Sequence, residues 1–248
     1  MRKCLVSTVF LLASAALFAA EANVWYVDDD NYNASGDGTS PENAFGSLQE
    51  ANDNENVKDG DVIKVLPGVY NQGSGRAHSE NSRLSRLVVT KRLRFEAVGG
   101  KDTVHVVGQL SSAAEKYGPD GMRCVYVAST AKGTQFHKFT FRDGSSNGAG
   151  GTGGEGNGKG DSDGGGICVY GAQSVGKSSA AFAGAFIVDC VVSNCYGRWS
   201  GAVRGGTAIR TLFKNCGGHT FGQVTSAVKK IHGMIFGKTP VHPRQHSG

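Results

Sequence analysis

A short pattern occurs twice in this chain, as Val192-Ser193-Asn194-Cys195 and again 21 residues later as Phe213-Lys214-Asn215-Cys216. A looser copy, Phe141-Arg142-Asp143-Gly144, stands 51 residues before the first of these. Two low-complexity, glycine-rich insertions, near residues 148–163 and 172–185, account for that longer spacing. A unit of about 20 residues cannot bury its apolar face alone, so it must stack on its neighbours. The spacing therefore predicts a solenoid of stacked coils.

The remaining sequence indicates short strands separated by turns. Glycine makes up 38 of the 248 residues, and no helix-length amphipathic segment separates most of the apolar runs. This pattern excludes a doubly wound α/β fold and favours the all-β class. The expected strand runs are 62–66, 87–89, 93–98, 104–107, 124–127, 136–141, 167–170, 186–192 and 208–213.

The repeated residues have distinct expected roles in a coil. The apolar members Phe141, Val192 and Phe213 should point inward and stack on one another. Asn194 and Asn215, with Asp143 less closely, should stand at a bend where the amide bonds to the turn and to the next coil. Before the coils, Ser47 followed three residues later by Glu50 forms a capping box, which predicts a short helix.

The first 22 residues have the pattern of a secretory signal peptide. Arg2 and Lys3 precede an apolar run from residue 5 to 20, and Ala20-Glu21-Ala22 offers a cleavage site. A run of about 16 residues is short against the roughly 20 of a spanning helix. We therefore expect a secreted, periplasmic or cell-surface protein with no stable membrane insertion after cleavage.

Charge and cysteine content narrow the expected partners. Removal of residues 1–22 lowers the formal net charge from +5 to +4, and no Lys/Arg block predicts nucleic-acid binding. Five cysteines remain, of which Cys195 and Cys216 should lie on adjacent coils. They form either a disulfide or a column of small buried residues, and the sequence leaves both interpretations open.

Several stretches resemble secreted bacterial right-handed parallel β-helix proteins of the pectate-lyase-like superfamily. The resemblance rests on Trp25-Tyr26-Val27-Asp28, Gly36-Asp37-Gly38-Thr39-Ser40-Pro41, Ala44-Phe45 and the run from Asp59 to Tyr70. It implies a right-handed parallel β-helix with a short N-terminal capping helix and about six or seven coils. Residues 23–58 would form the N-terminal strand and cap, and residues 59–222 the coils. Residues 223–248 form a basic tail or a truncated C-terminus.

The resemblance implies two classes of function. Some members of the superfamily cleave uronic-acid polysaccharides by β-elimination, with calcium held by carboxylates and an arginine or lysine base, whereas others bind glycans. No lyase motif occurs here. Asp143 and Asp189 are the candidate calcium ligands, and Arg204 and Arg210 the candidate bases, but a solvated or ladder role is the favoured interpretation of each.

The first functional hypothesis is therefore an extracellular scaffold associated with acidic polysaccharide or a cell-surface glycan, with a binding or structural role. Its candidate binding residues are Tyr196, Arg198, Trp199 and Arg204, because aromatic rings beside guanidinium groups suit sugar stacking and carboxylate pairing. A tryptophan packed against its own loop is the plainer alternative. A polysaccharide lyase is the second hypothesis. No metal or cofactor is expected, except calcium for the lyase.

A phosphate-loop pattern supports a third hypothesis, a nucleotide-binding module. Residues 171–178, Gly171-Ala172-Gln173-Ser174-Val175-Gly176-Lys177-Ser178, match G-x-x-x-x-G-K-[ST]. A functional phosphate loop leads into a helix whose N-terminus holds the phosphates. The segment from Ser179 to Ala185 is too short for such a helix, so we expect no nucleotide binding.

Overall fold

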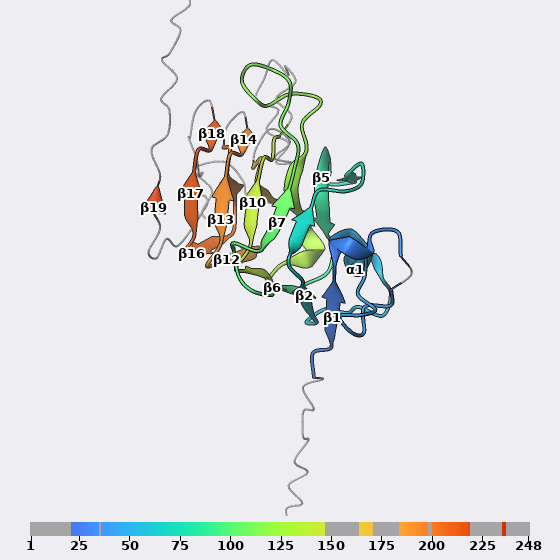
Figure 1. The fold of residues 1–248 in the computed structure, drawn as a ribbon. Coiled ribbons are helices and arrows are strands. Elements are labelled where there is room, and N and C mark those ends of the chain that lie inside the picture. Colours follow the sequence, from blue (N-terminus) through green and yellow to red (C-terminus); the bar gives the residue numbers. More distant parts are fainter. Residues whose placement is uncertain are drawn as a thin grey trace, which may run out of the picture.

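The computed structural model describes residues 21–34, 36–146, 164–170, 184–197, 200–218 and 235–236. It is an all-β structure in which 41% of residues are in strands and helices are few. Three sheets carry nearly all of the strands, and Figure 1 shows them stacking from β1 and α1 at one end to β19 at the other.

The three sheets are built almost entirely from parallel pairs. Sheet A contains, in order, β1 (Val24–Val27), β2 (Val62–Val65), β6 (Arg94–Ala97), β9 (Thr134–His137), β12 (Ala185–Val188) and β16 (Thr207–Ile209). Sheet B contains β3 (Gly68–Tyr70), β7 (Val104–Val107), β10 (Thr140–Arg142), β13 (Val191–Ser193), β17 (Leu212–Lys214) and β19 (Ile235–Phe236). Sheet C contains β4 (Arg76–His78), β5 (Asn81–Val89), β8 (Arg123–Val127), β11 (Ile167–Val169) and β15 (Val203–Arg204). A further pair joins β14 (Tyr196–Gly197) to β18 (Gly217–Gly218), and only β4 and β5 among these strands pair antiparallel.

The chain visits the sheets in a fixed order. Strands β6, β7 and β8 lie in sheets A, B and C respectively, and the next three, β9, β10 and β11, return to the same sheets one position further along. Each of these circuits, which we call coils, therefore adds one strand to each of the three sheets. This arrangement is compatible with a parallel β-helix. β19, which lies within the predicted tail, extends sheet B by pairing with β17.

The register confirms the predicted inward column. Phe141 is aligned with Val192, and Val192 with Phe213, although 51 residues separate the first pair and 21 the second. The same column continues through Val106 to Tyr70. All five side chains are buried. The register is therefore the same for spacings of 51 and 21 residues.

Two sets of left-handed residues turn the chain at the ends of the sheet B strands. The second corner, which follows sheet B, contains Asp143, Asn194 and Asn215, with φ of 57°, 51° and 53°. Asn and Asp tolerate this conformation best among residues with a side chain. Asn194 also donates its side-chain amide to Asp143 on the preceding coil, so the predicted bend and its bond between coils are confirmed.

The first corner, between sheets A and B, was not predicted. It contains Lys138, Asp189 and Arg210, with φ of 63°, 55° and 46°. The expected single runs 136–141, 186–192 and 208–213 are each divided here into two strands. The prediction was wrong because lysine and arginine carry no sequence signal for a left-handed turn.

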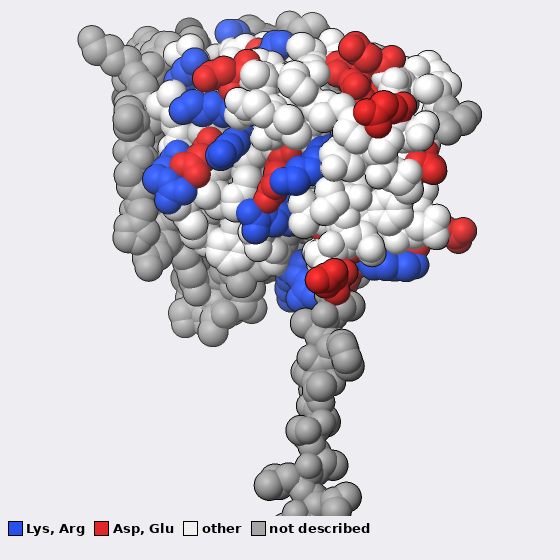
Figure 2. Space-filling model, turned by 60° about the horizontal axis from the view of Figure 1, so that its bottom comes forward, with Lys and Arg blue, Asp and Glu red and all other residues white. Residues whose placement is uncertain are grey.

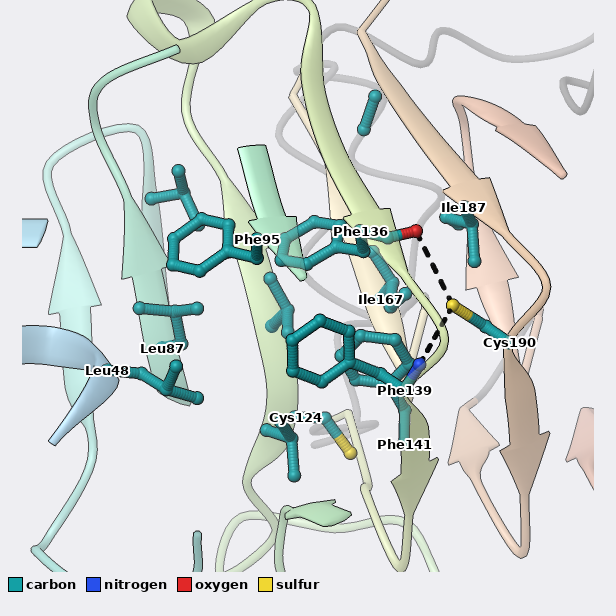
Figure 3. Close-up of a cluster of buried hydrophobic side chains, with 14 of the residues drawn as sticks. Leu48, Leu87, Phe95, Cys124, Phe136, Phe139, Phe141, Ile167, Ile187 and Cys190 are labelled. Atoms are coloured by element: carbon teal, nitrogen blue, oxygen red, sulfur yellow. Dashed lines mark hydrogen bonds between the residues drawn. The ribbon is translucent and has the colours of Figure 1, made fainter. Parts of the chain in front are cut away.

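Phenylalanine rings fill the centre of the coils, as Figure 3 shows. Phe95 and Phe136 stack between coils with centroids 5.2 Å apart, and Phe136 meets Phe141 edge-on at 5.5 Å. Cys190 closes this cluster, because its Sγ accepts from the Phe139 amide at 3.4 Å and donates to the Phe136 carbonyl at 3.5 Å. Such aromatic pairs stabilise the core beyond the area they bury.

The predicted helix covers one end of this core. α1 (Leu48–Asp53) begins after Ser47, whose hydroxyl accepts from the Glu50 amide at 3.1 Å. The Glu50 carboxylate reaches back to the amide of Gly46 at 2.9 Å, which completes a capping-box arrangement. Leu48 and Ala51 are buried against the first coil. η1 (Asp29–Asn31) and η2 (Ser129–Ala131) are short 3-10 turns.

The five cysteines in the described residues are free thiols and all are buried. Cys195 contacts both Cys124 and Cys216, which makes a column of three sulfur atoms. Burial raises the pKa of the Cys190 thiol to about 12 and raises that of Cys195 as well. The structure therefore has the column of small buried residues and no Cys195–Cys216 disulfide.

Candidate functional site

The candidate calcium ligand Asp189 and the candidate base Arg210 bind each other. Arg210 Nε and Nη2 donate to Asp189 Oδ1 and Oδ2, both at 2.6 Å. This hydrogen bonding lowers the pKa of Asp189 and raises the pKa of Arg210. An arginine whose proton is held more firmly is a poorer base, so the pair suits the predicted structural role better than the catalytic one.

The other candidate calcium ligand, Asp143, lies at a different corner. Its carboxylate accepts from Asn194 and from the Arg142 guanidinium, one contact on each oxygen. Asp143 contacts Asn194 at the second corner, whereas Asp189 stands at the first corner, so the strand β13, at about 3.3 Å per residue, separates the two aspartates. The two aspartates therefore do not form one calcium site.

The predicted carbohydrate residues are only partly brought together. Tyr196 lies in β14, and the Lys116 ammonium stands 4.9 Å from the centre of its ring, so a cation already occupies one ring face. Arg204 lies in β15, aligned with Cys168 of sheet C, whereas Arg210 lies at the first corner. Arg198 and Trp199 lie outside the described residues, as does the phosphate-loop match at 171–178.

The outer face of sheet A carries charges of both signs. Glu96 pairs with Lys64 and with Arg94, and Asp189 pairs with Arg210 further along the sheet. Figure 2 shows blue and red side chains interspersed over the face that comes forward there. Such pairing leaves no uniform field that would attract a polyanion to this face.

A polar cavity lies at the opposite end of the molecule from β19, beside the capping helix. It has a volume of about 190 Å³ and lies between η1, the start of α1 and the loop that follows β3. We call it the N-terminal cavity. The residues that matter for its chemistry are Asp29, Tyr32, Ser47, Gln72, Arg76 and Arg86. Its volume is below the roughly 300–1,000 Å³ of pockets for drug-sized ligands, so it suits a single ring or a smaller group.

Arg86, from β5, is the main charged group of the cavity. Its Nε donates to the carbonyl of Val107 at 2.9 Å, and its Nη1 donates to the carbonyls of Gln72, at 2.7 Å, and Gly73. Its Nη2 has no hydrogen-bond partner, and its charge no carboxylate partner, among the described residues. Burial lowers the pKa of Arg86, and guanidinium groups stay protonated in proteins. The cavity therefore contains a fixed cation that forms no direct ion pair with a carboxylate of the described residues.

Asp29 shapes the opposite wall of the cavity. Its Oδ2 accepts from the Val69 amide at 2.8 Å, while Oδ1 is buried without a partner. Desolvation by burial raises the pKa of this carboxyl. Gly68 is required beside it, because a Cβ at that position would lie 1.7 Å from Asp29 Oδ1. Asp29 is thus a packed wall residue, and the contacts of the described residues include no ion pair between it and Arg86.

Arg76 supplies a second cation at the rim of the cavity. Its Nη1 lies 2.6 Å from Asp53 Oδ2, and both side chains are more than one third exposed. An exposed pair of this kind is weak and readily exchanged for another anion. The arrangement can bind a small anionic group at Arg86, with Arg76 as a replaceable outer contact.

Sequence reasoning missed this cavity for a physical reason. Arg86 looks like an outward residue of a strand, and its three acceptors are backbone carbonyls, which no sequence motif encodes. Two features of the sequence could have indicated the cavity: Gly68 in the run from Asp59 to Tyr70, and the aspartates after Val27. Both belong to the wall of the cavity, and neither indicates the position of Arg86.

Among the described residues no helix is long and apolar enough to cross a membrane. None of the protein-family models, curated proteins or solved structures with which the chain was compared matches it.

Proposed function

We propose that this protein is an exported right-handed parallel β-helix of the pectate-lyase-like superfamily that binds acidic polysaccharide. Its role is recognition or scaffolding, and the N-terminal cavity holds a uronic-acid carboxylate. The observation that carries the proposal is the Arg86 guanidinium, fixed by three carbonyls and without a counter-ion among the described residues.

The cavity chemistry favours a carboxylate over a neutral sugar. A guanidinium that is already held in place loses little conformational entropy when a ligand binds, and its Nη2 still has hydrogens to donate. A carboxylate would both accept this hydrogen bond and supply the missing negative charge. The +4 charge of the chain after residue 22 favours the same class of polymer.

Binding is better supported than cleavage. A lyase needs an unprotonated base beside calcium-bound substrate, yet Asp189 and Arg210 are engaged with each other and Asp143 is engaged by Asn194 and Arg142. In the N-terminal cavity, Asp29 Oδ1 is buried against Gly68 and the Arg86 guanidinium is engaged by three backbone carbonyls, so neither group is placed as a free base. Recognition needs only the fixed cation.

The test is retention on immobilised polygalacturonate against a neutral glucan. Arg86→Gln should weaken binding about ten- to a hundredfold, which corresponds to loss of a charge-assisted hydrogen bond of about 1.5–3 kcal/mol. Because Arg86 also holds the loop at Gln72 and Gly73, Arg86→Lys is a second variant that keeps the charge but not the fork. Arg92→Gln is the matched control, since Arg92 is exposed and outside the cavity.

The outcomes separate the alternatives. Loss of retention in Arg86→Gln but not in Arg92→Gln, with unchanged melting temperatures, supports the cavity. Loss only in Arg204→Gln would move the site to the late coils. Unsaturated uronate products would show a lyase, and absence of retention in the wild type would remove the glycan proposal.

A further inference from the structure

Asp61 is a buried anion at the point where β1 begins. Its carboxylate is only 3% exposed. Oδ1 accepts from the Asn23 backbone N at 3.0 Å and from the Asn23 side chain at 3.3 Å. Oδ2 accepts from Trp25 Nε1 and from the Lys58 backbone N, both at 2.8 Å. All four donors are uncharged, and no cationic group contacts Asp61 among the described residues.

A buried carboxylate that contacts no cationic group is unusual, because burial of a charge is costly unless an opposite charge accompanies it. One of its partners is the backbone nitrogen of Asn23, directly after the predicted cleavage sequence Ala20-Glu21-Ala22. Ala22 and Asn23 are exposed, so the bond between them is accessible to a protease. The Asn23 carbonyl accepts from the Val62 amide at 2.9 Å, which fixes the residue on its other side.

We propose that cleavage of the Ala22–Asn23 bond supplies the missing cation, so that the new α-ammonium of Asn23 forms an ion pair with Asp61. An endopeptidase of the signal-peptidase type hydrolyses the amide with one water molecule. Ala22 leaves as a carboxylate with the leader, and the Asn23 nitrogen takes up a proton. The 3.0 Å separation of this nitrogen from Asp61 Oδ1 already suits a hydrogen bond, so the backbone need not move.

Maturation would therefore stabilise the N-terminal end of the coils as well as release the chain. Before cleavage the Asn23 amide offers Asp61 one neutral hydrogen, and after cleavage the same atom offers three hydrogens and a positive charge. The ion pair pins the start of β1 to the turn before β2, where the first coil joins the cap. The inference is independent of any glycan.

The pH dependence follows from the amine. A free α-amino group titrates at about 8 in an unfolded chain, and a neighbouring carboxylate favours its charged form in the folded protein. The extra stability is thus complete below about pH 8 and is lost as the pH rises through the higher folded value. The other charged groups near Asp61 are Lys58, Asp59 and Lys91, and they are identical in the two forms compared below.

The experiment uses the full chain exported from its own leader. N-terminal sequencing should give Asn23. A second form carries one glycine inserted between Ala22 and Asn23, which moves the ammonium one residue away from Asp61. The Asn23 form should melt about 2–4 °C higher at pH 7, the shift typical of 1 kcal/mol in a chain of this size. The difference should vanish near about pH 10.5.

Asp61→Asn in both forms completes the double-mutant cycle, and Glu55→Gln, an exposed neighbour, is the matched control. The difference should disappear with Asp61→Asn and persist with Glu55→Gln. A mature chain that begins elsewhere, or a difference unaffected by pH, overturns the inference. If Asp61→Asn does not fold, the pH comparison of the two wild-type forms still decides.

Discussion

Asn194 donates its side-chain amide to the carboxylate of Asp143, although the two residues are 51 positions apart in the sequence. Both residues have left-handed backbones, and each ends a strand of sheet B on neighbouring coils. The side chains that permit the turn are therefore also the ones that join one coil to the next.

Asn194→Ala should lower the free energy of unfolding by about 1–3 kcal/mol. Alanine is strained in the left-handed conformation, and the substitution removes the amide that donates to Asp143. Asn194→Gly, which restores the backbone freedom but not the amide, should recover part of this loss. Denaturant unfolding of both variants measures the two contributions. Equal losses would mean that the backbone conformation contributes nothing.

Phe213→Ala should cost about 3–5 kcal/mol, because it opens a cavity in the inward column beside Val192. Lys214→Ala is the adjacent control on the exposed face and should remain within about 0.5 kcal/mol. The comparison is made by urea melts monitored by circular dichroism. Similar losses from the two substitutions would contradict the register of β17.

Glu80→Gln should make the protein less sensitive to acid. Burial alone would raise the pKa of Glu80, but hydrogen bonds from Ser129 and Tyr126, with the nearby His78, outweigh it and lower the pKa. The ionised carboxylate therefore stabilises the fold above about pH 4.5, and this stability is lost as the pH falls through the lowered folded value.

The expected loss in Glu80→Gln at pH 7 is about 1–3 kcal/mol, and it shrinks toward zero as the pH falls below the lowered pKa of Glu80. Thermal melts at a series of pH values test this. Glu115→Gln, an exposed control, should show no such convergence.

Gly68→Ala should destabilise the cap by about 1–3 kcal/mol, since the new methyl group would overlap the Asp29 carboxylate. Asp29→Ala in the same chain removes the carboxylate that the new methyl group would overlap, so the double variant should recover much of that loss. A double-mutant cycle in urea quantifies the coupling. Strict additivity of the two changes would show that the close approach is not what requires glycine.

The thiols of the native protein should resist labelling by a polar thiol reagent, because the five cysteines of the described residues are buried and burial raises the pKa of Cys190 and of Cys195. Unfolding under non-reducing conditions should release five reactive thiols in a chain that begins at Asn23. A count of three would show that one pair, such as Cys195 and Cys216, had formed a disulfide.

The sequence predicted those parts of the fold that repeat. The alignment of Phe141, Val192 and Phe213 could be predicted because an apolar residue recurs two positions before an Asn or Asp. The capping helix could be predicted from the spacing of Ser47 and Glu50. The first corner could not be predicted, since Lys138 and Arg210 adopt a backbone that their side chains do not favour. Tertiary packing imposes that conformation.

The candidate site followed a different logic. Asp189 and Arg210, predicted from side-chain chemistry as a candidate calcium ligand and a candidate base, are engaged with each other. Arg86 is held by the backbone carbonyls of Gln72, Gly73 and Val107. Because every residue type has a backbone carbonyl, the sequence does not indicate these contacts. The antiparallel strand β4, which borders the cavity, also lacked a recognisable turn signal.

The alignment of Phe141 with Val192 and of Val192 with Phe213 has a practical use. The aligned residues are 51 positions apart in the first pair and 21 in the second, yet both pairs have the same register. The length of the chain between successive sheet B strands can therefore differ without changing how the strands align. A peptide inserted after Gly218, which follows Asn215 of the second corner, should be displayed without shifting the inward column of Phe141, Val192 and Phe213. The stacked strands thus set a fixed spacing, and the segments that connect them can be exchanged.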